Sequence, residues 1–195
     1  PASDVLRRIA HLAIAHGIGS RVTVGHCCSL AVQHEAEADR TLDLVAEAGL
    51  SIVSLPGSNT YLQAREPGRT PRWRGITLLH EMRARGIPVA VGGDNCRDPF
   101  HPYGDFDPLD SFRDAVRIAH LDDPVDGWTP IVTTAPGAIV DRPQWIAEGE
   151  PADLLLFRAA SVEELLARPG SHRQLIRDGR FIDNPLPDFS ELDRC

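Results

Sequence analysis

The chain has 195 residues, of which 42% are hydrophobic and 25% are charged. This composition is ordinary for a folded domain and supports one sizeable core, or one domain with a small appendage. A net charge of −8 and a pI near 5.4 argue against a nucleic-acid partner.

Targeting and redox signals are absent from the sequence. No apolar run reaches 18 residues, so we expect no membrane span. The start of the chain lacks a signal-peptide pattern, and the four cysteines form no CxxC motif. We therefore expect a reduced, cytoplasmic protein. The basic residues are all arginine, which excludes Schiff-base lysine chemistry within this segment.

Three segments repeat one order of features: an amphipathic helix, a glycine and a short apolar strand. Each glycine suits the left-handed position that ends a helix, and each β-branched strand suits burial on both faces. A solenoid repeat has a similar period but a stronger shared motif, so a parallel βα barrel or sheet is favoured. The helices are 6–16, 35–48 and 77–85, the glycines are Gly17, Gly49 and Gly86, and the strands are 21–26, 50–55 and 87–91.

The pattern changes towards the end of the chain. Helices are expected over 108–120 and 132–140. After Gly149 we expect a strand over 152–157 and a short helix over 162–167. A hairpin over 174–182 should turn at Asp178-Gly179. We place the domain boundary near residues 147–151, which gives an α/β domain over 1–148 and a β-rich segment over 149–195.

Two of the predicted strands end in side chains that can do chemistry. The first runs into Gly25-His26 and the third into Gly93-Asp94. Parallel strands present their carboxyl ends at one mouth, where α/β barrels carry their active sites. A histidine and a carboxylate there suit a hydrolytic metal site, in which the carboxylate accepts the proton of an activated water. The residues alone leave open that His26 caps a strand and Asp94 caps a turn.

Two polar segments read as long loops above that mouth. One covers residues 94–104, and the other covers 56–65 and continues through 70–75. Such loops often shape substrate pockets. A connection that its prolines hold rigid and that contacts no ligand would have the same sequence pattern. Arg72, Trp73 and Arg74 are candidates for binding an anion or an oligomer partner, or for a solvated loop.

Several other reactive side chains carry weaker signals. Cys27 and Cys28 follow His26 directly, but no acid that would orient a cysteine–histidine pair is evident, so a cysteine nucleophile is disfavoured. The remaining histidines on predicted helices or turns are interpreted as structural or solvated. These are His11, His16, His34, His80, His120 and His172.

Taken together, these motifs resemble the second half of cytosine deaminase-type amidohydrolases, over essentially the whole chain. The matching segments are Gly25-His26-Cys27, Leu55-Pro56-Gly57-Ser58-Asn59, Leu62-Gln63-Ala64-Arg65, Arg74-Gly75-Ile76-Thr77, Gly93-Asp94-Asn95, 98–104, 151–154 and 177–180. The resemblance implies an α/β fold of the (β/α)8 TIM barrel type, with this chain supplying about strands 6–8. It also implies a C-terminal β-sandwich segment.

The resemblance also implies roles for individual residues. His26 would hydrogen-bond the metal-activated hydroxide, or ligate the metal in two-metal relatives. Asp94 would ligate a divalent metal ion, zinc or iron, and shuttle the proton. Asn95 and Phe100 would line the substrate ring. Family members often carry other residues at these last two positions.

The sequence departs from the family in what it lacks. No His-x-His occurs in the 195 residues, and the family's strand-five histidine and catalytic glutamate would precede Pro1. We therefore expect the remaining half of the barrel, and a further copy in a homo-oligomer, as partners.

The expected reaction is hydrolytic deamination of a small nitrogen heterocycle such as cytosine, with release of ammonia. The alternatives are a cyclic amide hydrolase of the hydantoinase or dihydroorotase kind and a non-catalytic barrel remnant.

Overall fold

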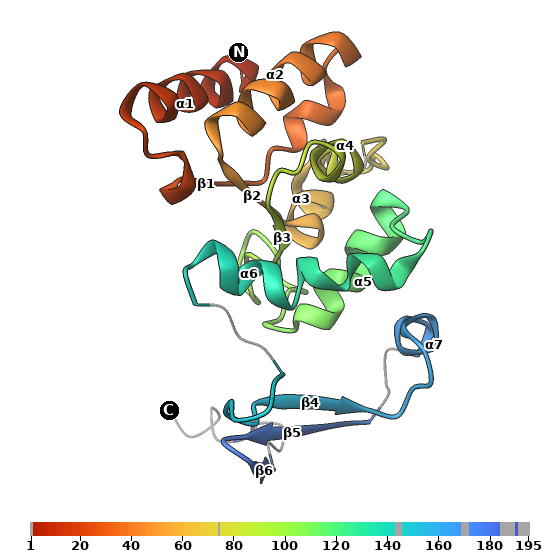
Figure 1. Ribbon diagram of the computed structural model, residues 1–195. Helices are drawn as coiled ribbons and strands as arrows, with labels where there is room; N and C mark the ends of the chain where they lie inside the picture. Colours follow the sequence, from red (N-terminus) through yellow and green to blue (C-terminus); the bar gives the residue numbers. More distant parts are fainter. Residues whose placement is uncertain (1, 74, 143–145, 169–171, 184–189, 191–195) are drawn as a thin grey trace. The chain divides into compact units, whose positions relative to one another are not determined.

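The computed structural model describes residues 2–73, 75–142, 146–168, 172–183 and 190. The chain divides into two compact units, residues 1–144 and residues 145–195 (Figure 1). The first unit is built of alternating helices and parallel strands, and the second is built on an antiparallel sheet.

The first unit contains a three-stranded parallel sheet in the order β1-β2-β3. Its strands are β1 (Thr23–Gly25), β2 (Ser51–Ser54) and β3 (Val89–Val91). Its α-helices are α1 (Ala2–His16), α2 (Glu35–Ala48), α3 (Pro56–Leu62), α4 (Leu79–Ala84), α5 (Pro108–Ala119) and α6 (Thr134–Ile139). Three 3₁₀ segments join them: η1 (Gly19–Arg21), η2 (Cys28–Val32) and η3 (Val125–Ile131).

The helix–glycine–strand repeat is confirmed. Gly17, Gly49 and Gly86 all have φ between +62° and +69°, the left-handed region that only glycine enters without strain. Each strand is shorter than its apolar run, but the pairing is parallel and in register, with Val24 opposite Ile52 and Ile52 opposite Val89. All three strands therefore end at the same edge of the sheet.

The core of this unit lies between the sheet and its helices. β3 is buried along its whole length, and Leu42 and Val45 of α2 are fully buried, as are Leu50 and Ile52. Gly19 passes so close to the end of α2 that a Cβ atom there would lie 1.6 Å from the Ala48 carbonyl oxygen. Only glycine, which has no Cβ atom, allows the segment between α1 and β1 to approach α2 this closely.

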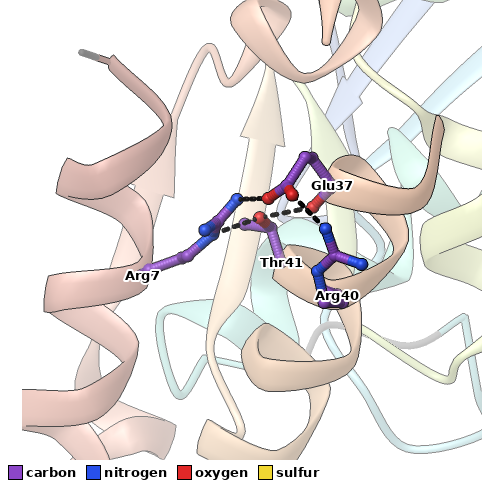
Figure 2. Close-up of polar contacts among 4 residues, drawn as sticks. All are labelled: Arg7, Glu37, Arg40 and Thr41. Carbon is purple, nitrogen blue, oxygen red and sulfur yellow. Dashed lines mark hydrogen bonds and ion pairs between the residues drawn. The ribbon is translucent and has the colours of Figure 1, made fainter. Parts of the chain in front are cut away.

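Helices α1 and α2 are joined by a polar network around Glu37, which Figure 2 shows. The Arg7 guanidinium donates to Glu37 Oε2 at 2.5 Å and to Thr41 Oγ1 at 2.8 Å, and Thr41 is fully buried. Arg40, on α2 itself, also donates to Glu37. The hydrogen bonds from Arg7 and then Arg40 lower the pKa of the Glu37 carboxyl.

The first unit differs from the sequence-based expectation in two segments. Residues 56–62, which were expected to be loop, form helix α3. Pro56 occupies its first turn, where the missing N–H costs nothing, but Gly57, Ser58 and Asn59 are poor helix formers. Packing of α3 against its surroundings overrides this weak propensity. The segment Val125–Ile131 was likewise not expected to be helical.

The second unit contains an antiparallel sheet in the order β4-β5-β6. Its elements are β4 (Leu154–Phe157), α7 (Val162–Ala167), β5 (Arg173–Arg177) and β6 (Arg180–Ile182). Ser161 Oγ accepts from the Glu164 N–H and starts α7, and the hairpin turns at Asp178-Gly179, both with positive φ, as expected. Assignment of this sheet to a β-sandwich stays a prediction.

Among the described residues, no helix has the length and apolarity that a membrane span requires.

The network of Figure 2 makes a testable prediction about stability. Arg7→Ala removes a bond between two helices and leaves the buried Thr41 hydroxyl without its arginine donor, so Tm should fall by about 2–4 °C. Arg40→Ala removes an exposed ion pair within one helix, so its effect should be smaller. Thermal unfolding followed by circular dichroism measures both, and equal shifts would contradict the inter-helix role of Arg7.

Candidate functional site

His26 lies directly after β1 and is exposed. Its backbone has φ +67°, a region that costs a non-glycine residue strain, and Cys27 follows at +52°. Two long-range bonds hold this turn: His26 N–H donates to the Val53 carbonyl at 2.9 Å, and Thr77 Oγ1 donates to the Cys27 carbonyl at 2.9 Å. The surrounding structure therefore fixes the place of the imidazole.

The His26 ring is oriented by an amide from α3. Its Nδ1 lies 2.8 Å from Asn59 Oδ1. Because an amide oxygen only accepts, the hydrogen of this bond is on Nδ1, which leaves Nε2 as the nitrogen open to a metal or a water.

Asp94 lies three residues after β3 and is also exposed. Its φ is +65°, and the strand end before it is held by the Gly92 N–H, which donates to the Ser54 carbonyl at 3.0 Å. One carboxylate oxygen, Oδ2, accepts from Ser58 Oγ at 2.7 Å. The side chain is thus held by a residue 36 positions away and does not cap its own turn.

His26 and Asp94 therefore both form hydrogen bonds with the same element, helix α3. Their partners Asn59 and Ser58 are consecutive residues of this helix, with exposures of 7% and 0%. The sequence pattern predicted that the two strand ends would converge but missed both partners, because their segment was expected to be a loop. Two signals were available: Pro56 suits a helix N1 position, and residues 55–59 are among the motifs that resemble the family.

Close backbone contacts fix α3 in place. A Cβ atom on Gly75 would lie 2.4 Å from Thr60 N, and Gly75 N–H donates to Gln63 Oε1 at 2.7 Å. On Gly57, a Cβ atom would lie 3.2 Å from the His101 ring. The helix is thus clamped between the 63–75 connection and the loop that follows Asp94.

That loop is organised by Asp98. Asn95 Nδ2 donates to Asp98 Oδ2 at 2.6 Å, and the N–H groups of Phe100 and His101 donate to Oδ1 at 3.0 and 2.8 Å. These bonds, that of Asn95 foremost, lower the pKa of Asp98. Asp98 thereby links the two predicted substrate-contacting residues, and the Phe100 side chain is 61% exposed. The substrate roles of Asn95 and Phe100 stay predictions.

The neighbouring thiol is unsuited to nucleophilic catalysis. Burial, with a smaller effect of Cys28, raises the pKa of Cys27 to about 11, so it is protonated at neutral pH. The Cys27 thiol donates a weak hydrogen bond to the Gly25 carbonyl, with an Sγ–O distance of 3.6 Å. This agrees with the expectation that cysteine is not the nucleophile.

The donor set fits part of a metal site. An imidazole and a carboxylate, each held by a neighbour and each with one donor atom left, are the ligand types of zinc and iron hydrolases. Within the ranges that the structure describes, no three His, Cys, Asp or Glu side chains cluster closely enough to hold a metal ion. His26 and Asp94 are thus two candidate ligands among the described residues, whereas hydrolytic sites commonly use three or more from the protein.

Comparison with known proteins identifies the family. The family model for the amidohydrolase family matches residues 2–183. This chain belongs to the amidohydrolase family. Deaminases of the family are generally metal-dependent, which agrees with the ligand types of His26 and Asp94.

The relatives of this amidohydrolase chain include deaminases. A pterin deaminase of Rhizobium rhizogenes (strain K84 / ATCC BAA-868) is 56% identical over 190 residues, covering 96% of this chain and 44% of that protein. The structure of 5-methylcytosine deaminase from Klebsiella pneumoniae with 5-fluorocytosine superposes with a TM-score of 0.81 at 27% identity, covering 94% of this chain and 45% of that one.

A third similarity bears on the fold alone. N-isopropylammelide isopropylaminohydrolase from Burkholderia multivorans has a TM-score of 0.71 at 23% identity, covering 92% of this chain and 43% of that one. The chain thus spans a little under half the length of these relatives. The numbering of its strands as 6–8 of a barrel stays a prediction.

The clamp on α3 gives a prediction with a matched control. Gly75→Ala and Gly68→Ala both place alanine at positive φ, but a Cβ atom clashes with backbone only at Gly75. Gly75→Ala should therefore lower the free energy of unfolding by about 1–3 kcal/mol more than Gly68→Ala does. Chemical denaturation measures the difference. Equal losses would show that Gly75 does not hold α3.

Proposed function

We propose that the whole protein is a metal-dependent hydrolytic deaminase and that its substrate is a pterin. The observation that carries this proposal is the 56% identity, sustained over 190 residues, to a pterin deaminase. The structural similarity to 5-methylcytosine deaminase, at 27% identity, supports the same reaction class and keeps cytosine as the second candidate. Both substrates carry an amino group on a ring carbon flanked by a ring nitrogen.

The proposed reaction replaces that amino group by oxygen. Water adds to the ring carbon, the C–N bond to the amino group breaks, and ammonia leaves. A bound divalent cation, zinc or iron, would lower the pKa of the water so that it attacks at neutral pH. We propose His26 and Asp94 as two of the protein's ligands and place the others outside these 195 residues.

The chain's own residues would handle protons and the ring. The Asp94 carboxylate, one oxygen of which accepts from Ser58, would take the proton of the attacking water and pass it to the leaving amine. His26 Nε2 would hold the water or a metal ion while Asn59 retains Nδ1. Asn95 and Phe100 would contact the ring from the loop that Asp98 braces.

The substrate proposal is tested with the purified whole protein and a panel of pterin, cytosine, 5-methylcytosine, hydantoin and dihydroorotate. Ammonia release should be fastest with pterin, with a kcat/KM roughly tenfold or more above cytosine. Removal of the metal by a chelator should abolish turnover, and added zinc or iron should restore it. Faster turnover of cytosine would overturn the pterin assignment, and ring opening of the cyclic amides would overturn the deaminase assignment.

The role of Asp94 is tested by Asp94→Asn, which keeps the shape but removes the proton acceptor. We expect kcat to fall by about 10²–10⁴-fold. Asp105→Asn is the matched control, because Asp105 lies in the same loop and its side chain bonds Arg97 and the Phe106 N–H. Steady-state kinetics compare the two. Unchanged deamination by Asp94→Asn would contradict the assignment of Asp94 as the proton acceptor.

A further inference from the structure

The reaction proposed above assigns no chemical step to the buried pair Ser58 and Asn59, yet each hydrogen-bonds one of its two central residues. Ser58 Oγ lies 2.7 Å from Asp94 Oδ2, and Asn59 Oδ1 lies 2.8 Å from His26 Nδ1. The two helix residues are adjacent, so their Cα atoms are about 3.8 Å apart. Two residues in a single turn of α3 therefore hydrogen-bond side chains that follow β1 and β3.

The topology explains why one helix reaches both. Strand β2 lies between β1 and β3, and α3 begins two residues after β2 ends. Successive residues of an α-helix point about 100° apart. Ser58 and Asn59 can therefore face opposite neighbours of β2 while sharing one rigid backbone.

Each contact uses one functional atom and leaves the other. Ser58 donates to Oδ2 of Asp94 and leaves Oδ1, and Asn59 accepts from Nδ1 of His26 and leaves Nε2. A partner of this kind fixes the rotamer of a carboxylate and the tautomer of an imidazole.

The hydrogen bonding of the Asn59 side chain is not what a stabilising residue would show. Its Nδ2 is buried and has no hydrogen-bond partner among the residues that the structure describes. Leaving a buried amide half satisfied is unfavourable for folding, so the side chain is explained by what its oxygen does for His26.

We propose that Ser58 and Asn59 are positioning residues: together they set the orientation of Asp94 and His26 towards the metal and water. This inference rests on the proposed function for its kinetic consequence, but its effect on metal affinity does not depend on which substrate is used. The sequence placed the pair in a segment that resembles the family but gave it no role.

The test uses the whole protein with Asn59→Leu, Asn59→Asp and Ser58→Ala. Asn59→Leu and Ser58→Ala should each weaken zinc affinity, measured by competition with a chelator, by about 10–100-fold. Their kcat for the best substrate should fall by a similar factor, with KM changed less than about twofold, because the substrate ring is bound elsewhere. Asn59→Asp keeps an acceptor for Nδ1 and should recover most of the affinity.

Thermal stability distinguishes a positioning role of Ser58 and Asn59 from a purely structural role. Asn59→Leu replaces a half-satisfied buried amide by an apolar group, so Tm should stay the same or rise while zinc affinity falls. Ser54→Ala is the control for Ser58→Ala: Ser54 is also fully buried, and its hydroxyl has no partner among the described residues. Its zinc affinity and kcat should match those of the unaltered protein.

Two outcomes would overturn the inference. One is unchanged zinc affinity in both Asn59→Leu and Ser58→Ala. The other is a loss of affinity that follows a loss of Tm and is not recovered by Asn59→Asp. If the unaltered protein binds zinc but deaminates no pterin, the proposed function fails while the affinity measurements still decide the roles of Ser58 and Asn59.

Discussion

The parallel pairing of β1, β2 and β3 is the constraint on which the candidate site depends. Because the strands run the same way and in register, the residues after them emerge at one edge of the sheet. His26 and Asp94 are 68 positions apart in the chain (94 − 26), yet both reach α3. A one-residue slip of either outer strand would turn its side chains to the other face and move these two residues away from each other.

The site concentrates unfavourable local structure that the rest of the unit stabilises. His26, Cys27 and Asp94 all have positive φ, and Asn59 carries a half-satisfied amide. Long-range backbone bonds to Val53 and Ser54 hold the strained turns in place. Strain of this kind often accompanies function, because a residue selected for chemistry is not free to adopt the most stable conformation. The Arg7–Glu37 network, in contrast, joins α1 and α2 and serves stability.

The residues proposed for the reaction would form only part of its centre, in keeping with the chain's share of the relatives' length. They are two candidate ligands, the two residues proposed to position them, and the loop braced by Asp98. Because His26 and Asp94 follow the two outer strands of one three-stranded sheet, a single clamped helix contacts both candidate ligands.

Elements whose signals are local could be predicted from the amino-acid sequence. The glycines at 17, 49 and 86 and the Asp178-Gly179 turn each act within a few residues, so their structures were predictable. The resemblance of scattered motifs also indicated the amidohydrolase family and the candidate residues His26 and Asp94. The helix over 56–62 and the contacts of Ser58 and Asn59 with those residues became visible only in the folded chain. A helix of poor formers is stabilised by packing, and the hydrogen bonds of Ser58 and Asn59 join residues 36 and 33 positions apart, so no local signal announces them.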